Sequence, residues 1–440
     1  MAARLTAAAI LLLSGIVAWL AITVPLVART LQISIAVSMA YVAWLAWHGW
    51  RVMRGALAEA RSGAGEPTGL ARGLPFVSLV VPARNEAAVI RSAVTALRGM
   101  AYADAEGHSA FEVVVIDDGS ADGTGELAGH ADGAADLRVV RREPGGPRTK
   151  GGVLEFAMPY LRGQVVGVVD ADTLVERSFL ERAMVGWRRD ASAAALQVSR
   201  RPRNTTTWLT GAQAEEQLMD IASQCGRWAT DGTAELRGNG MFVRRDALEA
   251  VGGWSERALT EDLELSTRLS SAGYHITLAP EATVHEEAVE GLAALWRQRM
   301  RWAEGSLRRL LEHGPALLAG PQPLGRKLDF LAFAGEFLVP PLFVAAVITS
   351  LLTIPMPRPA DWTVPVSLFI GYGLGTFLLA LAGLAATGER GLALVGRAAR
   401  GAIFLSHWLV VVPAALLRIA VAPATMTFVQ TPRSAPPGDR

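Results

Sequence analysis

The segment VVVIDDGS (residues 113–120) places Asp117 and Asp118 directly after four β-branched residues. The segment VVDADT (residues 168–173) places Asp170 and Asp172 after two valines in the same way. A parallel sheet presents such side chains at its carboxyl edge, where open α/β sheets bind their ligands. Both segments therefore predict strands of one sheet whose aspartates meet at a shared binding edge.

Strand-like and helix-like segments alternate on both sides of these two. We expect helices at residues 86–99 and from residue 150, and strands at residues 76–83, 111–118, 137–142, 165–172 and 193–199. This alternation is typical of a mostly parallel sheet with helices on both faces, so we predict an α/β domain. No GxGxxG motif follows the first strand, and a dinucleotide-binding Rossmann domain is therefore not indicated.

The composition narrows the class of protein. The formal net charge is +1, so no global field favours nucleic acid as a partner. The single cysteine, Cys225, excludes an intramolecular disulfide and fits a reducing compartment. Hydrophobic residues make up 51% of the 440 residues, which points to membrane segments around a soluble domain.

Long uncharged runs stand at both ends of the chain. Four of them cover residues 5–28, 30–50, 337–357 and 362–388, and a fifth hydrophobic segment covers about residues 402–422. Each reaches the roughly 20 residues that a helix needs to cross a bilayer. Only Arg29 separates the first two runs. We therefore expect two transmembrane helices within residues 1–53 and about three within residues 329–425.

Arginines beside the spans predict the orientation. Three follow the second span, within residues 51–61, and three stand between the fourth and fifth spans, within residues 390–400. Because arginine-rich loops stay on the cytoplasmic side, we expect a multi-pass protein of the cell membrane with its central domain in the cytoplasm. The remaining segments are expected to be a linker (54–75), the cytoplasmic domain (76–285), amphipathic interface helices (286–328) and a disordered tail (426–440).

Two further motifs follow along the chain. LTEDLEL (residues 259–265) opens a helix in which Thr260 can cap the N-terminus and the acidic residues favour the first turn. QRMRW (residues 298–302) lies in an amphipathic helix whose leucines recur at helical spacing. This pattern is also typical of an interfacial helix that lies on anionic lipid. Its arginines expected to contact lipid are Arg297, Arg308 and Arg309.

Together, the four motifs, in this order and between hydrophobic ends, resemble those of membrane-embedded family 2 glycosyltransferases. That group holds the cellulose, hyaluronan, chitin and poly-N-acetylglucosamine synthases. The resemblance implies a GT-A-type nucleotide-sugar-binding domain. It also implies inverting, metal-dependent transfer from a UDP-sugar, either UDP-N-acetylglucosamine or UDP-glucose.

Three functions remain open at this point. The resemblance favours a growing β-linked polysaccharide as the acceptor, which the enzyme moves through its own spans with accessory export proteins as partners. The alternative is a non-processive enzyme that glycosylates a membrane lipid. A non-catalytic transporter or scaffold is the remote alternative, since the acidic motif positions are all present.

The same resemblance assigns roles to individual residues. Asp262 would be the general base, accompanied by Glu261 and Thr260, and would take the proton of the acceptor hydroxyl. Asp170 and Asp172 would hold Mg²⁺ or Mn²⁺, which prefer oxygen ligands. The residues expected to bind the nucleotide sugar are Glu86, Asp117, Asp118, Lys150, Asp170, Gln298 and Arg301. The residues expected to bind the acceptor are Trp302 and Trp254.

Some of these residues also have a structural explanation. Lys150 is one of only two lysines, the other being Lys327, and it stands at a helix start where a cation and N–H groups suit a pyrophosphate. An ordinary surface lysine is the alternative. Asp117 and Asp118 also suit a solvated turn, because DDGS is favourable turn chemistry. Trp254 can stack on a sugar or pack in the core.

Overall fold

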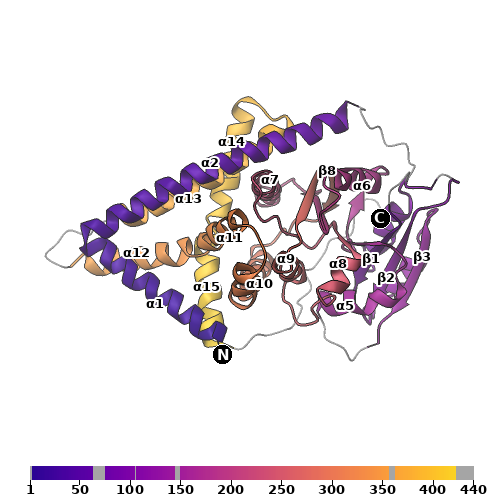
Figure 1. The fold of residues 1–440 in the computed structure, drawn as a ribbon, viewed down its shortest axis with the longest axis horizontal. Helices are drawn as coiled ribbons and strands as arrows, with labels where there is room; N and C mark the ends of the chain where they lie inside the picture. Colours follow the sequence, from indigo (N-terminus) through magenta and orange to yellow (C-terminus); the bar gives the residue numbers. More distant parts are fainter. Residues whose placement is uncertain (1, 63–74, 105, 144–148, 356–361, 423–440) are drawn as a thin grey trace.

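The computed structural model describes residues 2–62, 75–104, 106–143, 149–355 and 362–422 of the chain. They form a domain built on an eight-stranded sheet, which is joined to a group of long helices (Figure 1). The strands are β1 (Val77–Ala83), β2 (Phe111–Asp117), β3 (Asp136–Arg141), β4 (Val165–Val168), β5 (Leu174–Val175), β6 (Ala195–Pro202), β7 (Met241–Arg244) and β8 (Ile276–Glu286).

The strand order is β3-β2-β1-β4-β7-β6-β8-β5. The neighbours β3, β2, β1 and β4 run parallel, as do β6 and β8. Strand β7 runs antiparallel to β4 and β6, and β5 runs antiparallel to β8. The predicted α/β domain with a mostly parallel sheet is therefore confirmed, whereas β5, β7 and β8 were not expected from the sequence.

Two helical layers cover the sheet. The helices of the domain are α3 (Ile90–Arg98), α4 (Thr124–Gly129), α5 (Lys150–Ala157), α6 (Phe179–Arg188), α7 (Trp208–Ala229), α8 (Arg245–Ala250) and α9 (Glu261–Ser271). Val77 and Leu79 pack in one hydrophobic layer with α3 and α6, while Val80 packs in the other with α5 and α7. Successive strand side chains point to opposite faces, so a continuously hydrophobic strand needs a layer on each.

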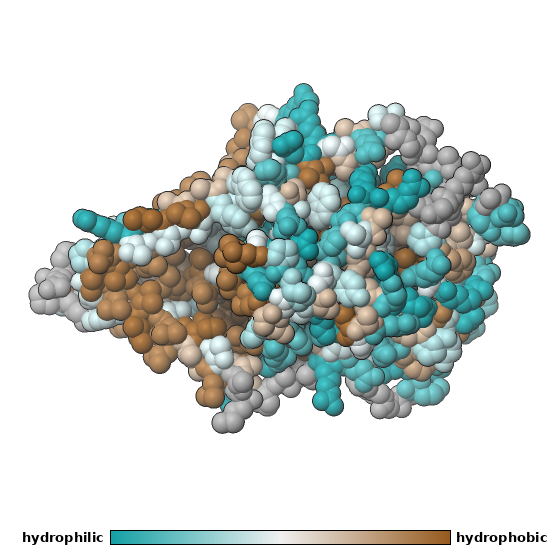
Figure 2. Space-filling view, in the orientation of Figure 1, coloured by the Kyte–Doolittle hydropathy of each residue, from teal (hydrophilic) through white to brown (hydrophobic). Residues whose placement is uncertain are grey.

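The second layer continues into the helices outside the domain, since Met53 and Leu379 belong to it. Those helices are α1 (Ala2–Thr23), α2 (Pro25–Arg61), α10 (Leu292–Ala319), α11 (Leu324–Glu336), α12 (Val339–Thr353), α13 (Thr363–Thr387), α14 (Gly391–Leu405) and α15 (Trp408–Val421). Among the described residues, five stretches are long and apolar enough to cross a membrane, two before the domain and three after it. Figure 2 shows hydrophobic side chains gathered over these helices and hydrophilic ones over the domain.

The boundaries of the spans differ from those expected. The first two helices meet at Val24 rather than at Arg29, because Pro25 lacks the N–H that would continue α1 and starts α2 instead. The third span begins at Leu324, in α11, and the fifth begins at Gly391, in α14. Each of these two spans is thus made of two consecutive helices.

The segments between the spans and the domain are described only in part. Helix α2 continues to Arg61, so the first part of the expected linker at residues 54–75 is helical. Residues 63–74 and the expected disordered tail at residues 426–440 lie outside the described residues. Helix α10 occupies most of the expected interface segment and lies between the sheet and the membrane helices (Figure 1).

Candidate active site

One cavity of about 1140 Å³ joins the carboxyl edge of the sheet to the membrane helices. On the domain side it is lined by the segments after β1, β2 and β4 and by the starts of α5 and α9. On the membrane side it is lined by α2, α11, α12, α13 and α15. Helix α10 runs along it with Gln298, Trp302, Ser306 and Arg309 on the wall, a spacing that places them on one helical face.

The turn after β1 carries Glu86 to the cavity. Asn85 has a φ of 50°, and its Oδ1 accepts the N–H of Ala121 at 3.0 Å. The N–H of Glu86 donates to Thr124 Oγ1 at 2.8 Å. These bonds tie the turn after β1 to the turn after β2. Glu86 is buried and lines the cavity, as does Asp118.

The end of β2 sends one of its two aspartates to the cavity. Asp118 lines the wall, and its carboxylate accepts a hydrogen bond from Arg142 at 2.8 Å. Asp117 is buried and accepts hydrogen bonds from Arg141 and from a backbone N–H of the following turn. It is not among the described residues that line the cavity. Asp118 therefore faces the cavity, whereas Asp117 holds the turn.

Asp170 and Asp172 follow β4 and both line the cavity. Asp172 is buried, with its Oδ2 3.4 Å from the backbone nitrogen of Glu287, whereas the side chain of Asp170 is 33% exposed. Asn239 holds this segment in place. Its Oδ1 accepts the N–H of Asp170 at 3.2 Å, and its Nδ2 donates to Glu286 at 2.9 Å.

The carboxylates of Asp170 and Asp172 suit Mg²⁺ or Mn²⁺ if the phosphates of a bound nucleotide sugar supply further oxygen ligands. Among the described residues, no group of three or more His, Cys, Asp or Glu side chains is arranged to hold a metal ion by itself. Mg²⁺ is commonly bound by one or two carboxylates together with substrate phosphates and waters. Asp170 and Asp172 fit that pattern, and a set of oxygen ligands alone disfavours zinc.

Lys150 stands at the start of α5 and reaches the end of β4. Its Nζ donates to Asp170 Oδ1 at 2.6 Å and to the carbonyl oxygen of Gly238 at 3.1 Å, and it lies 3.5 Å from Glu261 Oε1. Burial lowers the pKa of Lys150, but the carboxylates of Asp170 and Glu261 outweigh burial, so the pKa is raised and the side chain stays charged. One ammonium thus joins the acidic segments after β4 and at the start of α9.

The start of α9 presents Asp262 to the cavity. Its Oδ1 accepts the N–H of Leu263 at 2.8 Å. Glu261 is buried, and burial raises its pKa although the ammonium of Lys150 lowers it. Gly238 leaves room for Asp262, since it has a φ of 79° and a Cβ there would lie 3.0 Å from Asp262 Oδ2. Only glycine meets both the conformation and the space.

Thr260 does not cap α9, because its side chain makes no capping hydrogen bond and packs against α10 instead. A Cβ added to Gly305 would lie 2.4 Å from Thr260 Cγ2. Glycine at this position therefore lets the two helices approach closely. The contact fixes the face of α10 that carries Gln298, Arg301 and Trp302 to the cavity.

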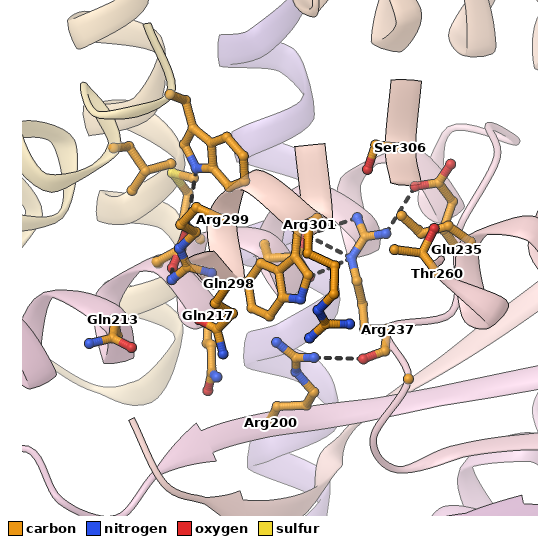
Figure 3. A pocket seen from close by; sticks show the side chains of 18 of the residues that line it. Arg200, Gln213, Gln217, Glu235, Arg237, Thr260, Gln298, Arg299, Arg301 and Ser306 are labelled. Carbon is orange, nitrogen blue, oxygen red and sulfur yellow. Dashed lines mark hydrogen bonds and ion pairs between the residues drawn. The ribbon is translucent and has the colours of Figure 1, made fainter. Parts of the chain in front are cut away.

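Gln298, Arg301 and Trp302 of the QRMRW motif lie on the cavity wall (Figure 3). Arg301 points into the pocket toward Arg200 (Figure 3). The ring centre of Trp302 lies 4.2 Å from Arg299 Cζ and 6.0 Å from Arg200 Cζ. Cations near an aromatic face are attracted to it, so the two arginines fix the orientation of the indole.

Two buried arginines of α10 were not predicted as site residues. Arg299 is 2% exposed and pairs with Glu216, and Arg309 is 3% exposed with its Nη1 2.6 Å from Glu235 Oε1. Both line the cavity. The expectation that Arg309 contacts lipid is wrong, because Arg309 is buried and forms an ion pair with Glu235. Arg309 stands seven residues after Trp302, on the same helical face, and this spacing was the signal that could have placed it at the cavity.

Trp254 does not reach the cavity. It is 3% exposed, belongs to the core layer that contains α5 and α9, and is not among the described residues that line the cavity. Its backbone N–H donates to Glu155 at 2.8 Å. The structure therefore places Trp254 in the core, which is the alternative that the sequence left open, because hydrophobic burial holds the indole there.

Glu286 and Glu287 at the end of β8 also line the cavity and were not predicted. Glu286 accepts the hydrogen bond from Asn239, and Glu287 pairs with Arg203 at 2.7 Å. The sequence VHEE at residues 284–287 places acids after a strand, as VVVIDD does. The signal that predicted Asp117 and Asp118, acidic residues directly after a strand, was therefore also present for Glu286 and Glu287.

A GT-A-type sheet whose carboxyl edge gathers these acidic motifs opposite an arginine-bearing helix defines the class of nucleotide-sugar-dependent glycosyltransferases. Residues 75–305 match the family model described as "Glycosyltransferase like family 2", and the chain belongs to glycosyltransferase family 2. The resemblance drawn from the motifs and the assignment as an enzyme are thereby confirmed.

Several known proteins are similar to this chain. The β-monoglucosyldiacylglycerol synthase of Synechocystis sp. is 33% identical over 417 residues, which cover 90% of this chain and 85% of the relative. The poly-β-1,6-N-acetyl-D-glucosamine synthase of Staphylococcus aureus is 27% identical over 243 residues, which cover 54% of this chain and 56% of the relative.

Among solved structures, the mannosyltransferase PcManGT of Pyrobaculum calidifontis, in complex with GDP-Man and Mn²⁺, has a TM-score of 0.53 at 22% identity. The similarity covers 89% of this chain and 97% of that one. It confirms the GT-A-like fold.

Proposed function

We propose that this chain is an inverting, metal-dependent glycosyltransferase of the cell membrane that transfers one sugar from a UDP-sugar to a lipid hydroxyl. This proposal replaces the polysaccharide synthase that the sequence favoured with the alternative, an enzyme that glycosylates a membrane lipid. Relatives named β-monoglucosyldiacylglycerol synthases match up to 90% of the chain, whereas the poly-N-acetylglucosamine synthase matches 54%. This difference supports diacylglycerol as the first acceptor to test and UDP-glucose as the first donor.

The observation that carries the proposal is the apolar wall of the cavity between the membrane helices. Ile35 and Met39 of α2, Leu342 of α12, and Leu368 and Leu379 of α13 line it. The acyl chains of a lipid that enters from the bilayer stay in apolar surroundings against such a wall. A polysaccharide would leave hydroxyl groups without hydrogen bonds there, at roughly 1–3 kcal/mol for each. The wall therefore favours a lipid over a polymer.

The domain end of the same cavity supports the chemistry. Asp262 would accept the proton of the lipid hydroxyl as it attacks the anomeric carbon, and a single displacement turns an α-linked donor into a β-linked product. Mg²⁺ or Mn²⁺ held by Asp170 and Asp172 would neutralise the charge of the leaving diphosphate. Arg301 is proposed for the diphosphate and Trp302 for the acceptor.

The orientation of the protein is part of the proposal. With the domain in the cytoplasm, the cavity receives the nucleotide sugar from the cytosol and the lipid from the bilayer. The arginines beside the spans support this orientation through the positive-inside rule.

A matched pair of substitutions on α13 tests the function. Gly375 lines the cavity, and a Cβ there would lie 3.7 Å from Met39 and from Val42, so Gly375→Leu places a larger side chain beside the apolar part of the cavity. Gly373 on the same helix has nothing within 4 Å of an added Cβ, which makes Gly373→Leu the control. Gly375→Leu should raise the KM for diacylglycerol several-fold while donor binding persists. Equal KM values for both variants would contradict a lipid in this cavity.

A further inference from the structure

Two buried arginines at the cavity have donor groups without partners. Arg227 of α7 and Arg309 of α10 are each 3% exposed, and both line the cavity. Among the described residues, Nη1 of Arg227 and Nε and Nη2 of Arg309 have no hydrogen-bond partner. A buried donor without a partner is costly, so native proteins nearly always provide one. The cavity is where such a partner could enter.

The two arginines belong to one cluster. The ring centre of Phe333 on α11 lies 4.4 Å from Arg227 Cζ and 5.6 Å from Arg309 Cζ. Phe333 itself lines the cavity, and α11 belongs to the third candidate span. The two guanidinium groups therefore lie beside a side chain of the membrane helices, on residues that line the cavity.

The cluster is also close to the catalytic motif. Gly305 contacts Thr260, and Arg309 follows Gly305 by one helical turn on the same face of α10. Glu235, the ion-pair partner of Arg309, lies on the same side of the pocket as Thr260 (Figure 3). Arg227 and Arg309 thus line the same cavity as Asp262 and the apolar wall.

The charges around these donors favour a neutral ligand. Nη2 of Arg227 lies 3.0 Å from Asp329 Oδ2, and Nη1 of Arg309 lies 2.6 Å from Glu235 Oε1. Each guanidinium charge is therefore compensated before any ligand arrives. Glu336, three residues after Phe333, adds a further carboxylate to the wall. The remaining N–H groups suit carbonyl oxygens better than the phosphate of a charged lipid.

We propose that Arg227 and Arg309 bind the ester carbonyl oxygens of the acceptor lipid. This inference rests on the lipid-acceptor function proposed above. In a diacylglycerol, the ester groups lie between the hydroxyl, which must reach Asp262, and the acyl chains, which need the apolar wall. The two arginines lie beside Phe333 of α11 in the cavity that Asp262 and the apolar residues also line, so they are the charged donors offered to these ester groups. They are thus specificity-determining residues for an acylated glycerol.

Diacylglycerol and dialkylglycerol of equal chain length provide the test, since the ether lipid lacks carbonyl groups. The wild-type full-length protein in liposomes should glycosylate the diacyl lipid with a kcat/KM about tenfold higher, as expected when hydrogen bonds to a charged donor are lost. The difference should appear in KM, with similar kcat for both lipids. Equal kcat/KM values would overturn the inference and leave the lipid-acceptor function standing. Failure to glycosylate either lipid would instead contradict the proposed function.

Substitutions connect this preference to the arginines. Arg309→Lys keeps a cation for Glu235 but removes the unpartnered guanidinium donors, so the ratio of diacyl to dialkyl kcat/KM should fall toward one. Arg308→Lys is the matched control, because Arg308 is the neighbouring residue, pairs with Glu304 and is not among the described residues on the cavity wall. Arg227→Lys provides a second variant should Arg309→Lys not fold. An unchanged ratio in the folded arginine variants, or an equal loss for both lipids, would show that the donors serve only water or packing.

Discussion

The Nζ of Lys150 lies 2.6 Å from Oδ1 of Asp170. Because Lys150 also lies 3.5 Å from Glu261, one side chain connects the segment that would hold the metal to the helix that presents the proposed base. The chain contains only one other lysine, Lys327. The position of this cation therefore relates the two acidic motifs to each other.

Replacing Lys150 should destabilise the fold in a pH-dependent way. Removing one partner of a fully buried ion pair costs about 3–5 kcal/mol. We expect roughly 1–3 kcal/mol for Lys150→Gln because the side chain of Asp170 is 33% exposed. In the variant, Glu261 stays buried without its cation, so its folded pKa lies further above its ordinary value of 4.5. Thermal unfolding of detergent-solubilised protein measures the loss.

The sign of the pH effect follows from linkage. A carboxyl group with a raised folded pKa contributes stability that is full below its unfolded pKa and is lost as the pH rises through its folded pKa. The gap in Tm between Lys150→Gln and wild type should therefore narrow from about pH 8 to about pH 5. Lys327→Gln serves as the control and should show no such trend. A gap that widened toward acid would contradict the pairing.

Asp262→Asn should abolish transfer and leave donor binding nearly intact. A general base contributes a factor of roughly 10² to 10⁴ in rate, and the amide keeps the shape of the side chain. Product formation and calorimetric binding of UDP measure the two effects separately. Asp132→Asn, at an exposed aspartate, is the control. Near-normal turnover of Asp262→Asn would remove this residue from the mechanism.

Activity should require a divalent cation. A chelator should stop the reaction and either Mg²⁺ or Mn²⁺ should restore it, whereas zinc should serve poorly because Asp170 and Asp172 offer only oxygen ligands. Asp172→Asn should raise the Mg²⁺ concentration needed for half-maximal rate. Full activity in excess chelator would refute the proposed metal site.

Gly305→Ala should loosen the contact between α9 and α10. The added Cβ would lie 2.4 Å from Thr260 Cγ2, and overpacking of this kind costs about 1–3 kcal/mol. Thr260→Ala removes that methyl group, so the double variant should recover part of the lost Tm. If the two effects on Tm simply added, the helices would not meet at this contact.

The sequence was most informative where local pattern decides the outcome. Strands β1 and β2 are short buried segments rich in valine, and their prediction needed no knowledge of the rest of the fold. Strand β7 has only four residues and lies antiparallel between β4 and β6. Such a short strand is defined by its neighbours, which the local sequence does not reveal.

The same distinction applies to the site. Asp172 reaches the cavity because it directly follows a strand of the sheet, and Asp262 and Trp302, which the resemblance to family 2 glycosyltransferases singled out, line it as well. Trp254 and Arg309 could not be placed in this way. A tryptophan suits a core and a sugar equally well. An arginine is buried only where the fold provides a charged partner, as Glu235 does for Arg309, and the local sequence does not show that partner.

Analysis of the product tests the proposed function most directly. Purified full-length protein would be incubated with diacylglycerol liposomes, labelled UDP-glucose and Mg²⁺, with Asp262→Asn as the inactive control. The label would then be followed into the organic and aqueous phases and identified by mass spectrometry. We predict a glycerolipid that carries a single β-linked hexose, with no growth of the product at longer times. A water-soluble or insoluble polymer with many sugars per chain would contradict the lipid-acceptor function and support the hypothesis of a polysaccharide synthase instead.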